Sequence, residues 1–146
     1  MTNTLSIPTM RPARSRSERP ARQLRTVLAM NAATSLLAGI CGLLAADWVS
    51  DTLGIGSENW TRVVGGGLFL FAIDVAIVAA RARAHLRSLT LAISILDIAW
   101  VAATAIVLAA VDLTTSGRVV AVVLGLGVLD FAVLQLWFRS RCARDE

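Results

Sequence analysis

The sequence predicts an all-α integral membrane protein: a four-helix bundle with both chain ends in the cytoplasm and a disordered basic tail at the N-terminus. Of its 146 residues, 56% are hydrophobic and 16% are charged, which is too apolar for an ordinary soluble domain. Four segments are each long enough to cross about 30 Å of hydrocarbon at a helical rise of about 1.5 Å per residue. The arginines gather at one end of these segments, and this asymmetry predicts the orientation.

Residues 1–25 form the predicted tail. The stretch RPARSRSERPARQLR is rich in arginine, proline and serine and has no apolar period, a composition typical of disorder. We interpret its arginines as a topology anchor that also attracts anionic lipid headgroups, at about 1 kcal/mol for each basic residue near the surface. A nucleic-acid partner is disfavoured, because no interleaved aromatic residues accompany the charges. A transit peptide is the remaining alternative, and it is disfavoured by Glu18 and by the span that follows at once.

The membrane domain is predicted over residues 26–138, and residues 139–146 form a short cytoplasmic tail. Its four spans are expected near residues 26–49, 62–80, 88–111 and 118–138. The connections between the spans are too short to hold another domain. A cleavable signal peptide is an alternative for the first span, but the apolar stretch is longer than the about 7 to 15 residues typical of such peptides.

Arginine sets the predicted orientation, since all 14 basic residues are arginines. Six of them precede the first span, three lie in the link at residues 81–87, and three follow the last span. The two other links carry Arg62 and Arg118 beside acidic residues. The positive-inside rule therefore places both termini and the middle link in the cytoplasm, as an even number of spans requires.

Small residues recur inside several spans. Ser35 and Gly39 lie in the first span, a glycine run occupies residues 65–67 in the second, and Ala121 and Gly125 lie in the fourth. A spacing of four places small side chains on one helix face, where two backbones can approach closely and gain dispersion contacts. The pattern predicts a tightly packed bundle.

Three aspartates lie in the middle of apolar runs: Asp74 in FAIDVAIVAA, Asp97 in SILDIAWVAA and Asp130 in GVLDFAVLQL. At the helical rise, they are expected about 10, 15 and 13 Å from the cytoplasmic boundary. Asn31 and Ser35 of the first span fall at the same height. The sequence therefore predicts one polar layer in the cytoplasmic half of the bundle.

This layer is informative because inserting an aspartate near the centre of a membrane span costs about 2.5 to 3.5 kcal/mol of free energy. We expect the three carboxylates to face the bundle, where they cannot all be ionised without a counter-charge, so a proton or a cation is held among them. Oxygen ligands suit a proton, Na⁺, Mg²⁺, Ca²⁺ or Mn²⁺ rather than zinc or copper. The proton- or cation-binding candidates are Asp74, Asp97, Asp130, Asn31 and Ser35. No cofactor and no His/Cys metal site is predicted.

Two structural interpretations stay open beside the functional one. Arg81 lies two turns after Asp74 on the same helix face and can reach back toward its carboxylate. Intramembrane polar residues also serve as interhelical hydrogen bonds, worth about 0.6 to 2 kcal/mol for each contact.

The stretches MNAATSLLAGICGLL, VVGGGLFLFAID, LDIAWVAATAIVLAA and LQLWFRSR occur in an order that resembles small bacterial four-span membrane proteins, loosely the DoxX-like family. The polar residues that carry the resemblance are Asn31, Asp97, Trp100 and Gln135. The resemblance implies a helical bundle in a bacterial inner membrane and no particular activity. A chain without lysine and rich in alanine and arginine also agrees with a GC-rich bacterial genome.

Two functions are predicted as alternatives. The first is a small proton- or cation-linked transporter or channel subunit, which four short helices would form as a homo-oligomer or with a partner membrane protein. The second is a non-catalytic membrane scaffold whose aspartates join helices. An enzyme is disfavoured, because the sequence has no Ser/His or Cys/His pairing and no His-rich metal pattern.

Overall fold

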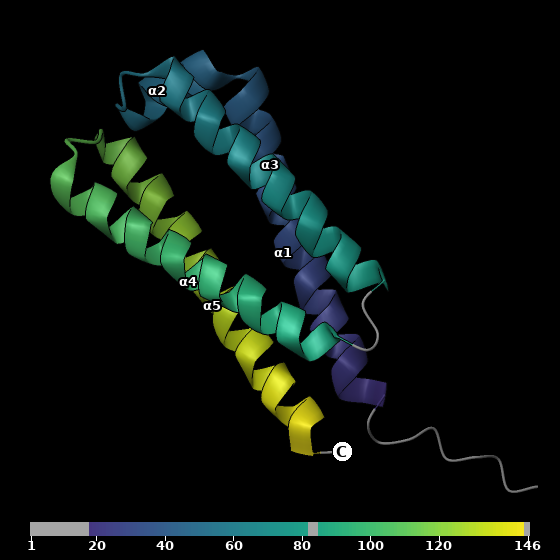
Figure 1. Cartoon of the computed structure of the whole chain (residues 1–146). Helices are drawn as coiled ribbons and strands as arrows, with labels where there is room; N and C mark the ends of the chain where they lie inside the picture. Colours follow the sequence, from purple (N-terminus) through teal and green to yellow (C-terminus); the bar gives the residue numbers. More distant parts are fainter. Residues whose placement is uncertain (1–17, 82–84, 145–146) are drawn as a thin grey trace, which may run out of the picture.

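The computed structural model describes residues 18–81 and 85–144, and all regular structure in these two ranges is helical (Figure 1). The helices are α1 (Glu18–Leu44), α2 (Ala46–Leu53), α3 (Glu58–Arg81), α4 (Leu86–Ala110) and α5 (Thr115–Arg144). All but α2 are long and apolar enough to cross a membrane, in agreement with the predicted number of four spans. The first 17 residues of the predicted tail lie outside the described residues.

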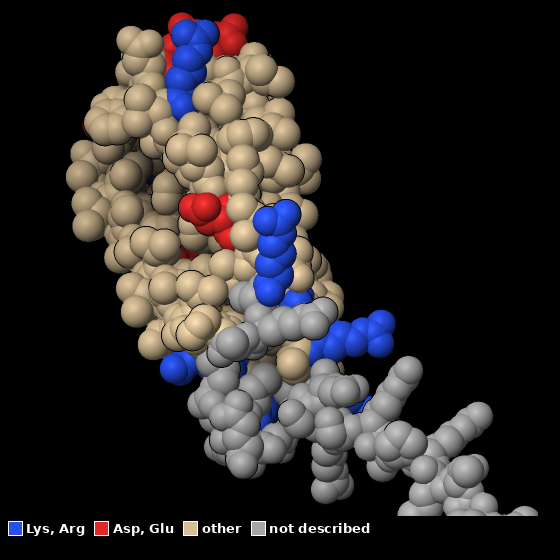
Figure 2. Space-filling view, turned by 45° about the vertical axis from the view of Figure 1, so that its right-hand side comes forward, with Lys and Arg blue, Asp and Glu red and all other residues tan. Residues whose placement is uncertain are grey.

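The four long helices alternate in direction, so that the molecule has two distinct ends (Figure 1). At the basic end, α1 begins, α3 ends, α4 begins and α5 ends. This end carries Arg19, Arg22, Arg81 and Arg139, whereas Asp112 and both acidic residues of α2 lie at the opposite end, named here the α2 end. Figure 2 shows this separation, with most of the blue side chains in the lower part of the view and red ones at the top. Both ends of the described chain lie at the basic end.

The helices form two antiparallel pairs, α1 with α3 and α4 with α5, and α1 joins the pairs by packing on α5. Glycines allow the first pair to approach closely. A Cβ atom at Gly65 would lie 2.7 Å from the carbonyl carbon of Gly42, and one at Gly39 would lie 2.7 Å from the Phe69 nitrogen. Gly39 and Gly65 therefore make the close approach that was predicted for small residues, but between α1 and α3 alone, and a Cβ at Gly67 would meet no atom within 4 Å. The remaining side of the bundle, between α3 and α4, has sparse contacts.

The first span differs from its prediction at both of its ends. The helix breaks at Ala45, and the residues that follow form the short helix α2 instead of continuing the span to residue 49. Helix α1 also begins at Glu18, within the segment that was expected to be disordered. Pro20 lies in the first turn, where a missing N–H group costs no hydrogen bond. Arg25 donates hydrogen bonds from Nη1 to the carbonyl oxygens of Ala79 at 2.9 Å and Ala80 at 3.3 Å. These two carbonyls lie in the last turn of α3, where the helix itself supplies no donor.

Packing is unequal between the two ends. The basic-end core consists of Leu24, Leu28, Ala32, Val75, Ala79, Leu86 and Ile93, against which Phe138 of α5 also packs. All four spans therefore meet in this half of the bundle. In the other half, no residue of α4 from 98 to 110 is buried. The buried residues of α4 thus extend only as far as Asp97.

Candidate functional site

Among the acidic residues whose burial the structure describes, Asp97 is the most completely buried, with 2% of its surface exposed. Its Oδ2 atom accepts two hydrogen bonds, from Asn31 Nδ2 at 2.9 Å and from Gln135 Nε2 at 3.0 Å. The three side chains come from α4, α1 and α5, so the carboxylate lies where three helices meet.

Two serines fix the orientation of the amides that contact Asp97. The Ser94 hydroxyl can donate to Gln135 Oε1, which lies 2.9 Å from Oγ, or to the carbonyl oxygen of Thr90 on its own helix. The Ser35 hydroxyl donates to Asn31 Oδ1 at 3.4 Å. Because each amide oxygen faces a hydroxyl, each amide N–H group points at the carboxylate. We refer to Ser35, Asn31, Ser94, Asp97 and Gln135 as the polar network; each of them is buried.

Helical spacing explains why these residues meet. On α4, Thr90, Ser94 and Asp97 are separated by four and three residues, which places them on one face. The same spacing holds for Asn31 and Ser35 on α1, and Gln135 follows the buried Ala132 by three residues on α5. Each helix therefore presents its polar residues on the same side as its packing residues.

The second carboxylate oxygen of Asp97, Oδ1, accepts no hydrogen bond from residues 18–81 or 85–144. No arginine or histidine in these ranges forms an ion pair with it either. A buried carboxylate therefore has two neutral donors at one oxygen and an unoccupied second oxygen. Such an oxygen is a natural position for a proton.

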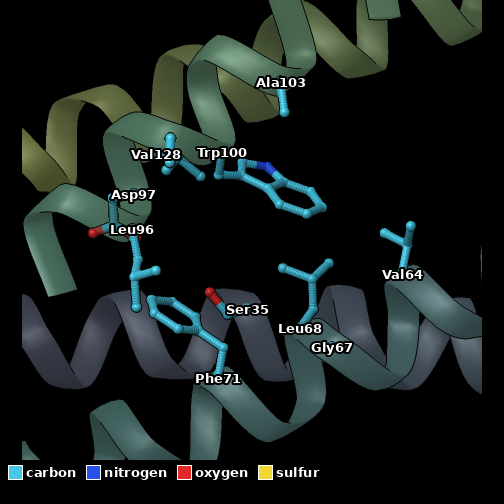
Figure 3. Close-up of a pocket in the computed structure, with 11 residues that line it drawn as sticks. Ser35, Val64, Gly67, Leu68, Phe71, Leu96, Asp97, Trp100, Ala103 and Val128 are labelled. Carbon is cyan, nitrogen blue, oxygen red and sulfur yellow. The ribbon is translucent and has the colours of Figure 1, made fainter. Parts of the chain in front are cut away.

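A cavity of about 390 Å³ lies between the two helix pairs, with Asp97 and Ser35 in its wall (Figure 3). Apolar and aromatic side chains of α3 and α4 form most of the remaining wall: Val64, Leu68, Phe71, Leu96, Trp100 and Ala103. A second cavity of about 300 Å³ shares Val64, Trp100 and Ala103 with the first and extends to Leu113 and Gly117 at the α2 end. We refer to the two cavities together as the α3–α4 groove. Asp97 lies at its inner end.

The expected layer of three carboxylates does not form, because Asp74 and Asp130 are exposed on the outside of the bundle. Depth was predicted from the sequence, but the rotation of each helix decides which way a residue faces. Asp74 follows the buried Ala72 by two residues and Asp130 precedes the buried Ala132 by two, a rotation of about 200° for each. Both aspartates therefore lie opposite the packing face of their helix. No ion pair joins Asp74 to Arg81 in the described structure.

Of the five predicted candidates, the structure brings together Asp97, Asn31 and Ser35. Ser94 and Gln135 complete the network and were not predicted as site residues. Ser94 could have been found from its spacing of three before Asp97, and Gln135 from its being the only amide side chain in the last span. The hydrogen bond between Ser94 and Gln135 could not have been found from the sequence, since the two residues are 41 positions apart and lie on different helices.

The polar network does not suit a hard metal ion. Among residues 18–81 and 85–144, no group of three His, Cys, Asp or Glu side chains lies close enough to hold one. Mg²⁺ and Ca²⁺ prefer about six or more oxygen ligands, whereas the amides here turn their N–H groups toward the carboxylate. A proton needs only one oxygen, so the geometry favours proton binding.

Comparisons with protein-family models, with curated proteins and with solved structures find no match for this chain. The resemblance to DoxX-like proteins therefore gains no support from them.

Proposed function

We propose that the protein is a proton-linked carrier in a bacterial cytoplasmic membrane, with Asp97 as the group that takes up and releases the proton. The observation that carries this proposal is a buried carboxylate with one unoccupied oxygen, placed at the inner end of a groove between two helix pairs.

The surroundings of Asp97 suit both of its protonation states. When the carboxylate is ionised, the amides of Asn31 and Gln135 stabilise the charge at Oδ2. When it is protonated, Oδ1 carries the proton and the same two hydrogen bonds persist. No fixed positive charge in the described structure pairs with the carboxylate and holds it in the ionised form. A site of this kind can change protonation without rearranging its neighbours.

The packing supports access from one side. The two cavities of the α3–α4 groove lie one after the other from Asp97 toward the α2 end, while the basic-end core fills the opposite direction. Carriers in general work by moving one helix bundle against another around a central site. In this proposal the two helix pairs are such bodies: α3 and α4 have sparse contacts, and the pairs would move about the contact between α1 and α5. The arginines at the basic end support an orientation with this end in the cytoplasm and the α2 end outside.

A homo-oligomer is part of the proposal. Asp74 and Asp130 are exposed within apolar spans, where lipid would penalise each by about 2.5 to 3.5 kcal/mol at the span centre. Contact with a second copy would shield them. Replacing both with leucine should shift the protein toward a monomer in detergent, as measured by light scattering, and an unchanged mass would contradict this assembly.

A membrane scaffold is the second candidate function, favoured by the hydrogen bond between Asn31 and Asp97. This bond crosses between α1 and α4, which otherwise have very few contacts, and so fastens one helix pair to the other. A scaffold requires the hydrogen bonds but does not require a change of protonation.

Infrared titration of the purified protein from about pH 5 to pH 8 separates the two functions. A proton-binding site predicts a carboxylic acid band that titrates in the wild type and is lost in Asp97→Asn. The control is the double variant Asp74→Asn with Asp130→Asn, which should keep the band because the polar network is intact. If Asp97→Asn leaves every titrating band unchanged, the carrier proposal is wrong and the scaffold is favoured.

A further inference from the structure

The wall of the α3–α4 groove combines two polar residues with aromatic and apolar ones, whereas a space that held only lipid chains would need apolar residues alone. Asp97 and Ser35 lie in its inner part, and its middle is formed by the indole of Trp100 and the ring of Phe71 (Figure 3). In Figure 3 the Trp100 side chain extends from α4 toward α3, and Leu68 extends from α3 on the facing wall of the cavity. Apart from Asp97 and Ser35, every side chain of this inner cavity is apolar or aromatic.

Three kinds of occupant can be compared by the contacts they would make. An acyl chain would match the apolar wall but offers nothing to Asp97 Oδ1. An anion would meet the carboxylate and no basic residue. A metal ion would find too few oxygen ligands. An organic cation with an apolar body meets all the features of the groove, because the carboxylate attracts its charge, the aromatic rings attract cations through their faces, and the wall contacts its body.

We propose that the groove binds a hydrophobic organic cation, which enters from the α2 end or from the bilayer and exchanges with the proton on Asp97. This inference rests on the proposed function, since it names the class of substrate that the proton-linked carrier would take. The exchange is balanced: the Oδ1–H bond of the neutral carboxylic acid breaks, one proton leaves to solvent, and one monovalent cation pairs with the resulting carboxylate. No bond to the cation forms.

The size of the groove agrees with this class. The inner cavity of about 390 Å³ and the second cavity of about 300 Å³ are neighbours that share Val64, Trp100 and Ala103 in their walls. Pockets for drug-sized molecules span about 300 to 1,000 Å³. The two cavities have room for a cation with several apolar groups.

Equilibrium binding of tetraphenylphosphonium to the full chain in an uncharged detergent tests the inference. The affinity should rise with pH while the proton competes for Asp97, by up to about tenfold for each pH unit. Asp97→Asn should weaken binding by about tenfold or more and abolish the pH dependence. Trp100→Leu should weaken binding by about threefold to tenfold through loss of the aromatic face. The neutral analogue triphenylphosphine oxide should bind equally to the wild type and to Asp97→Asn.

The double variant Asp74→Asn with Asp130→Asn is the matched control, since it removes two carboxylates on the outside of the bundle and should bind as the wild type does. Loss of binding in this variant, with binding kept in Asp97→Asn, would overturn the inference. If Asp97 titrates in the infrared experiment but the cation does not bind, the substrate class is wrong and the proton site stands. If Asp97 does not titrate, the proposed function itself fails.

Discussion

The two ends of the bundle are packed in different ways. At the basic end, side chains of all four spans meet in one core, and Arg25 closes the end of α3. Toward the α2 end, α1 and α3 still contact each other through glycines, but α4 buries no residue beyond Asp97. Asp97 therefore lies at the boundary between a closed half and an open half. The difference teaches that a bundle of four long helices can hold a polar site by packing side chains tightly in one half and loosely in the other.

The largest expected loss of stability comes from removing a buried side chain from the basic-end core. Leu28→Ala removes a side chain with no exposed surface and should lower the free energy of unfolding by about 2 to 4 kcal/mol. Leu37→Ala on the same helix is the matched control, because Leu37 is 65% exposed. Unfolding in mixed micelles measures both. Equal losses for the two variants would contradict the difference between the halves.

The next effect tests what holds the open half together. Gly65→Ala places a methyl group against the backbone of Gly42 and should cost about 1 to 3 kcal/mol by forcing α1 and α3 apart. Gly67→Ala places the same group in open space and should be neutral or stabilising by up to about 1 kcal/mol, since alanine favours a helix. The pair is compared in the same micelle titration. A neutral Gly65→Ala would show that the glycine contact is unimportant.

A smaller loss of stability is expected from a change in the polar network around Asp97, at the boundary between the two halves. Gln135→Leu removes one donor from Asp97 and the side-chain acceptor of Ser94, and should cost about 1 to 2 kcal/mol. Gln23→Leu is the control at an exposed amide of α1. If Gln135→Leu is as stable as its control, the hydrogen bonds of Gln135 do not help to hold α5 against α4.

The smallest effect is expected from the exposed ion pair at the α2 end. Arg62 and Glu58 are one turn apart on α3, and both side chains are about half exposed. Glu58→Gln should therefore change the free energy of unfolding by less than about 0.5 kcal/mol. A loss comparable with that of Leu28→Ala would mean that surface charge, rather than packing, stabilises the bundle.

The spans could be predicted from the sequence because apolar length alone specifies them. Which aspartate is buried could not be predicted, since FAIDVAIVAA and SILDIAWVAA look alike although Asp74 is exposed and Asp97 is buried. The distinguishing signal is the spacing of small and polar residues: Ser94 precedes Asp97 by three positions, whereas the small buried Ala72 precedes Asp74 by two. The break at Ala45 carries no proline or glycine and was not predictable from local propensity. The partners of Asp97 depend on how three helices pack, which no single segment encodes.

The most direct measurement asks from which side Asp97 can be reached. In a background with Cys41 and Cys142 replaced by serine, Asp97→Cys is treated in sealed, oriented vesicles with a small membrane-impermeant thiol reagent on one side at a time. Asp112→Cys and Ser140→Cys, exposed at the α2 end and the basic end, are the controls for sidedness. We predict that position 97 reacts from the α2 side and is protected from the basic side by the basic-end core. Reaction from the basic side only, or from neither side while both controls react, would contradict an open groove that leads to a buried carboxylate.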